Sequence, residues 1–352
     1  MRADRSGDAR PRVGVRCDAG PTLGVGHLVR CVGLAEEMRA RGWEVVFLAD
    51  VGGLSFAERL LGTRGLRVVP PPRETADYLE TVERESLDAV VLDSYTLPAE
   101  VSHALVAQDV AVLALVDGPL LGQRAHLYVD QNAGAEHICV DLPSGTRRLA
   151  GTRYAILRDD VRARRPDGPW RPPSAVHAPM DVVVAFGGTD AFGVTGQAVH
   201  ALSASRLPLR VTVVAPDEHV RGEVVAMSTD HVNITARAPF DEYPGLLASA
   251  DLVVGAAGTS VWEYCCLGRA AAVTAVADNQ EDTYAHLVSL GAVVGLGHLK
   301  DVSTDPAGWG ARLRTSIENR AVLSAVAAQA FALVDGRGRV RVVDGLATLV
   351  DG

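Results

Sequence analysis

The chain has 352 residues, enough for two domains of roughly 150 residues each. Its residues are 48% apolar and 22% charged, a balance that is typical of folded globular proteins and excludes a disordered chain. The net charge of −9 argues against a nucleic-acid-binding protein, which normally carries a basic excess.

The cysteine and lysine content argues against a zinc site and against a lysine Schiff base. Five cysteines form neither a CxxC pair nor a Cys/His cluster with zinc spacing, so we expect reduced thiols and no metal. The only lysine is Lys300, which argues against a lysine Schiff base.

Residues 1–10 lack the apolar segment of a secretory signal, and no stretch approaches the roughly 20 apolar residues of a membrane span. We therefore expect a cytoplasmic protein without a cofactor, present as a monomer or a weak homodimer.

The first half of the chain alternates strand and helix patterns. A short apolar strand begins at Val13, and a turn rich in glycine covers residues 20–26. Apolar residues at helical spacing predict a helix over residues 27–41, which Gly42 ends. A buried-strand pattern follows over residues 45–48, so the sequence predicts a βαβ unit with parallel strands.

Two further apolar runs, residues 89–92 and 110–116, predict strands that are each followed by an aspartate. Acidic residues just past strand ends lie where open α/β sheets bind ligands. The alternative is a helix cap, which is common for aspartate in this position. The candidate ligand contacts of this half are Asp18, Asp93, Tyr95 and Asp117.

The second half repeats the pattern after a proline-rich stretch. Residues 162–180 contain five prolines and predict a linker between an N-terminal domain over 11–161 and a C-terminal domain over 181–335, with a helical tail over 336–352. Within the second half, strands are predicted over residues 182–186, 210–215, 251–255 and 271–276, and a helix over 321–334. The predicted fold class is α/β, with two Rossmann-like, doubly wound domains.

The segment Gly24-Val25-Gly26-His27 follows a strand and opens a helix. Its glycines let a ligand approach the backbone, and the helix N-terminus favours an anion. Because the positive helix end disfavours a protonated imidazole, we expect His27 to stay neutral and to be able to accept a proton. A capping or packing histidine is the alternative. The dinucleotide fingerprint GxGxxG is absent, since its third glycine is missing.

Three other polar turns are candidates. Gly255–Ser260 joins a strand to a helix and can cradle phosphate with backbone amides, while Glu263, one turn later, can accept hydrogen bonds from ribose hydroxyls. Gly187–Asp190 can contact a diphosphate, and Asp278–Gln280 can hold sugar hydroxyls or an acetamido group. Ordinary strand–helix turns and an exposed loop are the structural alternatives.

In this order the segments resemble a known signature. Arg16-Cys17-Asp18, Gly24-Val25-Gly26-His27 and Arg30-Cys31 resemble the R-x-D…G-x-G-H-x-x-R-C pattern of the UDP-sugar hydrolase of pseudaminic acid biosynthesis and the related spore-coat polysaccharide biosynthesis proteins. The similarity continues in residues 91–95, 130–132, 151–158, 186–190, 255–268 and 277–280, and so spans about residues 12 to 300. The two halves also resemble the GT-B glycosyltransferase arrangement, as in the transferase that adds N-acetylglucosamine in lipid II synthesis.

The resemblance implies a GT-B fold whose two domains face a cleft, with the nucleotide held mainly by the C-terminal domain. It matches His27 to the catalytic histidine, Glu263 to the ribose-binding glutamate, and Tyr95 and Asn279 to positions that contact the sugar. Together with the turns above, the nucleotide-binding candidates are Gly188, Gly258, Thr259, Ser260 and Glu263, and the sugar-binding candidates are Asp18, Gly26, Tyr95, Asn279 and Gln280. The chain departs from the family pattern at Ser94, Gly118, Ala191 and Arg269-Ala270, which leaves the sugar open.

The function predicted from these residues and the resemblance is metal-independent hydrolysis of a UDP-linked N-acetylated amino sugar. Water deprotonated by His27 would attack the anomeric carbon with inversion and release UDP, in the biosynthesis of a sialic-acid-like sugar or of a surface or spore polysaccharide. One alternative is a GT-B glycosyltransferase with the same donor, in which His27 deprotonates an acceptor hydroxyl. A hydrophobic acceptor surface beside the N-terminal domain would favour it. A non-catalytic nucleotide-sugar-binding protein is the other alternative.

Overall fold

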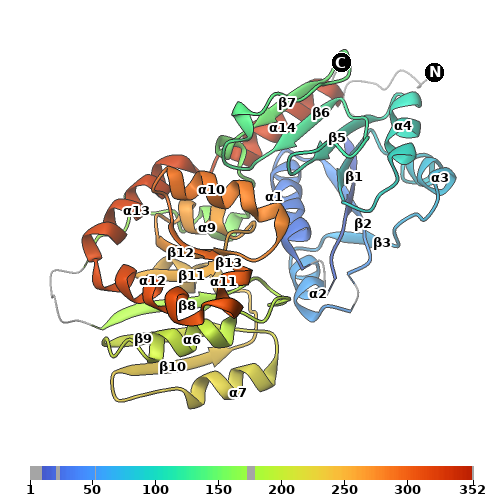
Figure 1. Cartoon of the computed structure of the whole chain (residues 1–352). Coiled ribbons are helices and arrows are strands. Elements are labelled where there is room, and N and C mark those ends of the chain that lie inside the picture. Colours follow the sequence, from blue (N-terminus) through green and yellow to red (C-terminus); the bar gives the residue numbers. More distant parts are fainter. Residues whose placement is uncertain (1–9, 21–23, 52, 173–178, 351–352) are drawn as a thin grey trace. The chain divides into compact units, whose positions relative to one another are not determined.

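The computed structural model describes residues 10–20, 24–51, 53–172 and 179–350, which form two compact units (Figure 1). The first unit contains Met1–Ala19, His27–Arg158 and Arg337–Gly352, and the second contains Gly20–Gly26 and Asp159–Gly336. Each unit has a parallel sheet with helices, so the predicted pair of Rossmann-like domains is confirmed.

The first unit holds a seven-stranded parallel sheet in the order β3-β2-β1-β4-β5-β6-β7. Its strands are β1 Arg12–Cys17, β2 Glu44–Leu48, β3 Arg67–Val69, β4 Ala89–Asp93, β5 Ala111–Leu115, β6 Leu127–Asp130 and β7 Arg147–Ala150. Its helices are α1 Gly26–Ala40, α2 Ser55–Gly62, α3 Thr75–Glu85, α4 Ala99–Ala107 and α14 Gly338–Val350, with short 3-10 turns η1 Ala135–His137 and η2 Thr152–Tyr154.

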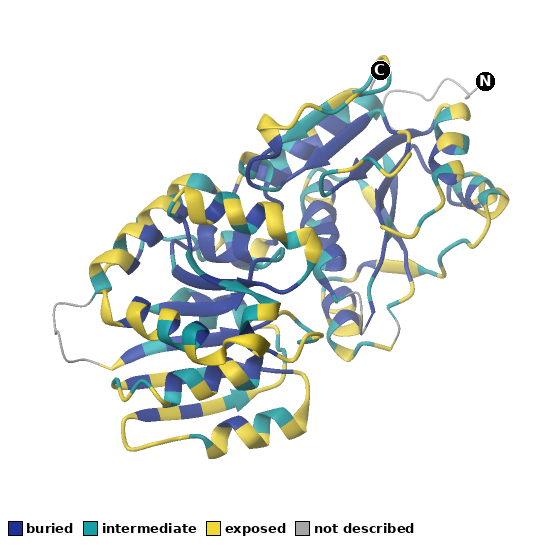
Figure 2. Ribbon diagram, viewed as in Figure 1, coloured by how far each residue is buried: buried dark blue, intermediate teal, exposed yellow. Residues whose placement is uncertain are grey.

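Alternating residues of this sheet enter two separate apolar cores, because successive strand side chains point to opposite faces. Val91 and Leu113 belong to the core that also contains the apolar side of α1. Their neighbours Val90 and Val112 belong to the core on the other face. The inner strands of both sheets are largely buried, as the dark blue ribbon in Figure 2 shows.

The first helix ends where the sequence predicts. Gly42 has φ of +82°, a left-handed conformation that is strained for residues with a side chain. The amide of Gly42 donates to the carbonyl of Arg39 at 2.9 Å, and the amide of Trp43 donates to that of Met38 at 3.0 Å. These bonds satisfy carbonyls at the helix end and turn the chain into β2.

The second unit holds a six-stranded parallel sheet in the order β10-β9-β8-β11-β12-β13. Its strands are β8 Met180–Ala185, β9 Leu209–Val214, β10 Val232–Arg237, β11 Leu252–Ala256, β12 Ala270–Ala275 and β13 Val294–His298. Its helices are α5 Asp159–Arg162, α6 Thr195–Ser203, α7 Glu218–Ala226, α8 Tyr243–Ser249, α9 Val261–Cys266, α10 Glu281–Ser289, α11 Leu299–Thr304, α12 Pro306–Glu318 and α13 Arg320–Leu333, with the 3-10 turn η3 Asp278–Gln280.

The start of the predicted linker is bonded into the second unit. Arg165 Nη1 donates to the carbonyl of Cys266 at 2.7 Å, and its guanidinium lies 3.7 Å from the ring centre of Phe331. Trp170 is 6% exposed and donates through Nε1 to Asp251 at 2.8 Å. The unit boundary therefore differs from the predicted one and lies before Asp159; residues 173–178 of the predicted linker lie outside the described residues.

The predicted C-terminal tail is a regular helix, α14, which packs on β5 and β6 of the first unit (Figure 1). Its buried residues Val342, Val343 and Leu346 enter the same core as α1. Arg339, 2% exposed, ties the helix to α1 through Glu36 at 3.0 Å. Within the described ranges no single helix has both the length and the apolar composition of a membrane span, and one bent pair, Pro306–Glu318 with Arg320–Val350, meets that criterion only jointly.

Candidate active site and nucleotide-binding residues

His27 and Asp93 follow the two strands at which the strand order of the first sheet reverses. β1 lies between β2 and β4, so the chain winds outward in opposite directions on either side of the β1–β4 pair. The carboxyl ends of such a pair leave a crevice in which doubly wound sheets bind their ligands. His27 is the second residue of α1, after β1, and Asp93 is the last residue of β4.

The imidazole of His27 is held by Asp93. Nδ1 lies 2.6 Å from Oδ1 of Asp93 and 3.2 Å from Nη2 of Arg30. The shorter contact, to a carboxylate, needs a hydrogen on Nδ1, so the neutral ring carries its proton there. Nε2 is then the proton acceptor, and no hydrogen-bond partner of Nε2 is found among the described residues. This arrangement suits a general base.

Arg30 links Asp93 to a second carboxylate, Asp117, which follows β5. Its Nε and Nη2 atoms donate to Asp93 at 2.7 and 2.6 Å. Its Nη1 and Nη2 atoms donate to Asp117 at 2.9 and 3.0 Å. The guanidinium is 3% exposed, so both bidentate pairs are shielded from water.

The charges of this group are mutually dependent. Burial by itself would raise the pKa of Asp93, but the charges of Arg30 and His27 outweigh burial and hold the pKa of Asp93 well below its ordinary value. Burial likewise opposes ionisation of Asp117, and Arg30 outweighs it and lowers the pKa of Asp117. Both carboxylates are therefore ionised near neutral pH.

Tyr95 joins the same group from the loop after β4. Its hydroxyl donates to Asp117 Oδ2. Its ring meets the His27 ring edge-on, with the ring centres 4.7 Å apart and the planes at 83°. Tyr95 is 39% exposed whereas His27 is 9% exposed, so the tyrosine offers the group's more open surface to a ligand.

Beyond Asp117 the polar contacts extend to β6 and β7. Nδ2 of Asn132 donates to Asp117 at 2.8 Å. The buried carboxylate of Asp130 accepts from the backbone amides of Asn132 and Gly118, each at 3.2 Å, and from Arg148, also at 3.2 Å. Burial raises the pKa of Asp130. The carboxyl ends of four neighbouring strands thus form one polar edge.

Asp18 lies at this edge but in a separate set of contacts. Its Oδ1 atom pairs with Arg16 at 2.7 Å, and its Oδ2 atom accepts from the hydroxyl of Ser94. Ser94 also accepts from the amide of Leu97 at 3.0 Å, so it organises the loop after β4. Gly26, another predicted sugar contact, is the first residue of α1.

The second unit places its predicted nucleotide contacts at the corresponding reversal point. Gly188 follows β8, and Gly258, Thr259 and Ser260 connect β11 to α9. These four residues are half-buried, and Glu263 in the first turn of α9 is 5% exposed. Gly255 is required by packing, because a Cβ there would lie 2.6 Å from the carbonyl oxygen of Ala185 on the paired strand.

Gln280 lies beside the β11–α9 turn, although β12 separates the two segments in the chain. A Cβ added to Gly258 would lie 3.2 Å from Nε2 of Gln280. Oε1 of Gln280 accepts from the amide of Val276 at 3.1 Å, which orients the side-chain nitrogen. Asn279, in the same 3-10 turn, is exposed. The structure thus brings the predicted Gln280 and Gly258 together.

The turn Gly187–Asp190 has a clear structural role. Gly187 has φ of +83°, and Asp190, with φ of +43°, accepts from the amide of Val194 at 3.2 Å ahead of α6. Burial raises the pKa of Asp190. Asp190 therefore holds the loop that leads into α6, and Gly188 is the member of this turn that remains a candidate ligand contact.

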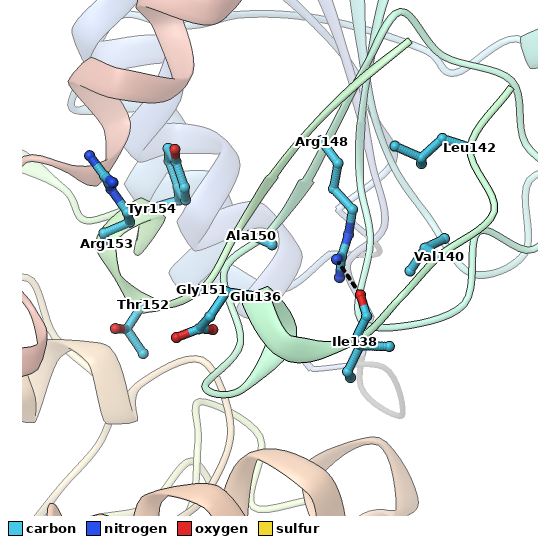
Figure 3. A pocket seen from close by; sticks show the side chains of 10 residues that line it. All are labelled: Glu136, Ile138, Val140, Leu142, Arg148, Ala150, Gly151, Thr152, Arg153 and Tyr154. Carbon is cyan, nitrogen blue, oxygen red and sulfur yellow. Dashed lines mark hydrogen bonds between the residues drawn. The ribbon is translucent and has the colours of Figure 1, made fainter. Parts of the chain in front are cut away.

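A hollow of about 620 Å³ lies in the first unit along the edge strand β7 (Figure 3). Ile138, Val140 and Leu142 supply apolar side chains, and Arg148 is held in place by a bond to the carbonyl of Ile138 at 3.0 Å. The remaining lining residues are Glu136, Ala150, Gly151, Thr152, Arg153 and Tyr154. Its volume is in the range of small-molecule pockets.

Arg30 belongs to the His27–Asp93–Asp117 group, but the sequence did not single it out as a site candidate. An arginine within a helix is usually solvated, and nothing in a single sequence distinguishes this one from its neighbours. The signal was its place in the matched segment Arg30-Cys31. In the part of the chain that the structure describes, no three His, Cys, Asp or Glu side chains gather in a way that could hold a metal ion, and no metal ligand is assigned.

Comparisons with known proteins locate the fold. No family model matches the chain. The spore coat polysaccharide biosynthesis protein SpsG of Bacillus subtilis (strain 168) is 23% identical over 295 residues, which cover 81% of this chain and 83% of that protein. MurG of Acinetobacter baumannii matches with a TM-score of 0.70 at 17% identity, covering 96% of this chain and 99% of its own. The spinosyn rhamnosyltransferase SpnG complexed with thymidine diphosphate matches with a TM-score of 0.62 at 16% identity, covering 95% and 100%.

The chain has the GT-B fold. Both sheets are parallel, with seven and six strands, and the likeness to these solved structures spans nearly the whole of each chain. The fold class predicted from the sequence is therefore confirmed. The finer prediction of a hydrolase in pseudaminic acid biosynthesis finds no support among these proteins, one of which is named a rhamnosyltransferase.

Proposed function

We propose that this chain is a glycosyltransferase that moves a sugar from a nucleoside diphosphate to an acceptor hydroxyl. The observation that carries the proposal is the 2.6 Å contact of His27 with Asp93, which leaves Nε2 as a proton acceptor. The GT-B fold and the likeness to a thymidine diphosphate-bound transferase support the donor class. Likeness to SpsG supports a role in polysaccharide biosynthesis.

In the proposed reaction Nε2 of His27 takes the proton of the acceptor hydroxyl as its oxygen attacks the anomeric carbon. The bond from that carbon to the diphosphate breaks, and its electron pair leaves with the diphosphate. This single displacement inverts the anomeric centre. Backbone amides of Gly258, Thr259 and Ser260 would hold the diphosphate, and Glu263 the ribose. Gly188 would also contact the nucleotide, and Asp18, Gly26, Tyr95, Asn279 and Gln280 the sugar.

The hollow beside β7 favours transfer over hydrolysis. It lies in the same unit as His27, and its wall of Ile138, Val140 and Leu142 is the kind of apolar surface that water as an acceptor does not need. In chain order, the first residue that lines the hollow is Glu136. It lies four residues after Asn132, whose side chain donates to Asp117. We propose that the acceptor's apolar part occupies this hollow.

Hydrolysis of the same donor is the second candidate, because the R-x-D…G-x-G-H-x-x-R-C pattern resembles that of a UDP-sugar hydrolase. The chemistry differs only in what His27 deprotonates. NMR-monitored incubation with UDP-N-acetylated amino sugars and EDTA, with and without octyl glucoside as a model acceptor, separates the two. Transfer predicts a new inverted glycoside only when the acceptor is present. Prompt release of UDP and free inverted sugar without acceptor would establish the hydrolase instead.

The acceptor hollow has its own test. Ile138→Asp should weaken acceptor use about 10-fold by placing a charge on the apolar wall, while UDP binding stays unchanged. Val225→Asp on α7 is the matched control, since Val225 and Ile138 are each 43% exposed and only Ile138 lines the hollow. Equal acceptor KM values for the two variants would remove the hollow from the acceptor site.

A further inference from the structure

The environment of His27 differs from a simple histidine–aspartate pair because Arg30 stands between two carboxylates. In a simple pair, the aspartate's negative charge stabilises the imidazolium that forms when the histidine takes up a proton. Here Arg30 makes two hydrogen bonds to Asp93, at 2.7 and 2.6 Å, and so neutralises much of that charge. Asp93 and Arg30 alone would leave His27 a weaker base.

Asp117 restores the missing charge. It accepts two bonds from Nη1 and Nη2 of the same guanidinium, at 2.9 and 3.0 Å, and shares the Nη2 donor with Asp93. With both carboxylates ionised, Arg30, Asp93 and Asp117 together carry one net negative charge next to His27. That charge becomes balanced when His27 takes up one proton.

We propose that Asp117 is a positioning residue that sets the basicity of His27 through Arg30. Asp117 does not touch Nδ1 of His27, since that atom contacts Asp93 and Arg30. The inference rests on the proposed role of His27 as the base, but it concerns proton uptake by the free enzyme and does not need turnover to be tested.

Tyr95 acts on the same net negative charge, but its effect on the basicity of His27 is opposite to that of Asp117. Its hydroxyl donates to Asp117, which draws electron density away from the bonds between Asp117 and Arg30. Among the described residues, the charged and titratable groups in contact with the His27 ring are Arg30 from its own helix, Asp93 from β4 and Tyr95 from the following loop, and Asp117 is linked to it through Arg30. Cys31 contacts Asp93 at 3.4 Å, and burial raises its pKa well above its ordinary value, so it stays neutral.

The decisive experiment is an NMR titration of the His27 imidazole in the free, full-length protein, with its signal identified by its absence in His27→Asn. In Asp117→Asn the titration midpoint should fall by on the order of 1 pH unit, because one negative charge is lost while Arg30 remains. In Tyr95→Phe the midpoint should rise, because Asp117 loses a donor while the edge-on ring contact stays. Asp130→Asn is the control, since Asp130 is buried at the same sheet edge but has no bond to Arg30. Its effect should be clearly smaller than that of Asp117→Asn.

Opposite shifts in Asp117→Asn and Tyr95→Phe would establish the inference, since general loosening of the fold cannot move one midpoint in two directions. An unchanged midpoint in Asp117→Asn, or shifts of the same sign, would overturn it. If Asp117→Asn fails to fold, Tyr95→Phe decides alone, because Tyr95 is 39% exposed. Turnover is measured separately. If the midpoint shifts as expected but the parent protein neither transfers nor hydrolyses a nucleotide sugar, the proposed function is refuted and this inference stands.

Discussion

At the scale of single residues, the contact between His27 and Asp93 determines which ring nitrogen can accept a proton. The Nδ1 atom of His27 is committed to Asp93 at 2.6 Å, so proton transfer must use Nε2. His27→Asn keeps a polar side chain but removes that acceptor. We expect turnover to fall about 100-fold or more while nucleotide affinity stays close to that of the parent. Steady-state kinetics and UDP calorimetry check this.

The control for that substitution is His103→Asn on α4, where the exposed imidazole bonds to the carbonyl of Gly122. It should leave the rate unchanged. A His27→Asn protein that bound nucleotide poorly but kept its rate would show that His27 is a binding residue and not the base.

Glu263 provides the second test at this scale. Glu263→Ala should weaken UDP binding about 10-fold, since a carboxylate can accept from two ribose hydroxyls and a charged hydrogen bond contributes about 1.5–3 kcal/mol. Glu218→Ala is the matched control, because Glu218 occupies the first turn of α7 and is exposed. Unchanged UDP affinity by calorimetry would remove Glu263 from the ribose.

Site candidates could be predicted from the sequence where residue type and position carry a signal. Glycines and a histidine between a strand and a helix are visible in one sequence, as are His27 and the Gly258–Ser260 turn. The role of Arg30 was not visible, because its two carboxylate partners are 63 and 87 residues away along the chain. Nor could the sequence show that Asp18 already pairs with Arg16 and Ser94.

Elements with a continuous apolar core pattern could be predicted, and edge elements could not. β4 and β5 are fully buried and were found with their following aspartates. The four edge strands β3, β7, β10 and β13 were not predicted, because edge strands bury only part of their surface and lack a long apolar run; β7 even begins with two arginines. The inner strand β6 was not predicted either, although it is buried, because its four residues are too few to form a pattern. α14 was predicted as a helical tail over residues 336–352, and the structure has a helix from Gly338 to Val350.

Gly338 gives a prediction at the scale of the element. A Cβ at this position would overlap the carbonyl oxygen of Ala155, a backbone atom that cannot rotate away. Gly338→Ala should therefore destabilise the docking of α14 by about 1–3 kcal/mol. Gly62→Ala, at the end of α2, has open space around its Cβ and should be neutral or slightly stabilising. Urea unfolding of both variants checks this, and equal stabilities would show that α14 shifts at little cost.

On the scale of the whole molecule, the first unit is assembled from chain segments far apart in sequence. Val342, Val343 and Leu346 of α14 complete a core that starts at Val13. Burial of each side chain contributes about 1.5–3 kcal/mol, so the three together approach the 5–15 kcal/mol that stabilises a typical domain. A stop after Gly336 should leave the first unit unfolded.

Hydrogen exchange of the truncated chain measures which of the two units loses its structure. Amides of β1 and β6 should lose protection, while those of β8 and β11 keep it, because the described core around β8 and β11 is built from residues between Trp170 and Ala327, all of which the truncated chain retains. Retained protection in β1 would mean that the first sheet folds without its last helix.

The position of α14 also sets the order of events during synthesis. The strands of the first unit have all been made by residue 150, but the helix that closes their core starts at Gly338, after the entire second unit. At about 5–20 residues per second a ribosome takes roughly 10 to 40 s to make the intervening chain. For that time the nascent first sheet exposes an apolar face, which makes it a client for ribosome-associated chaperones, while the second unit can already fold to completion.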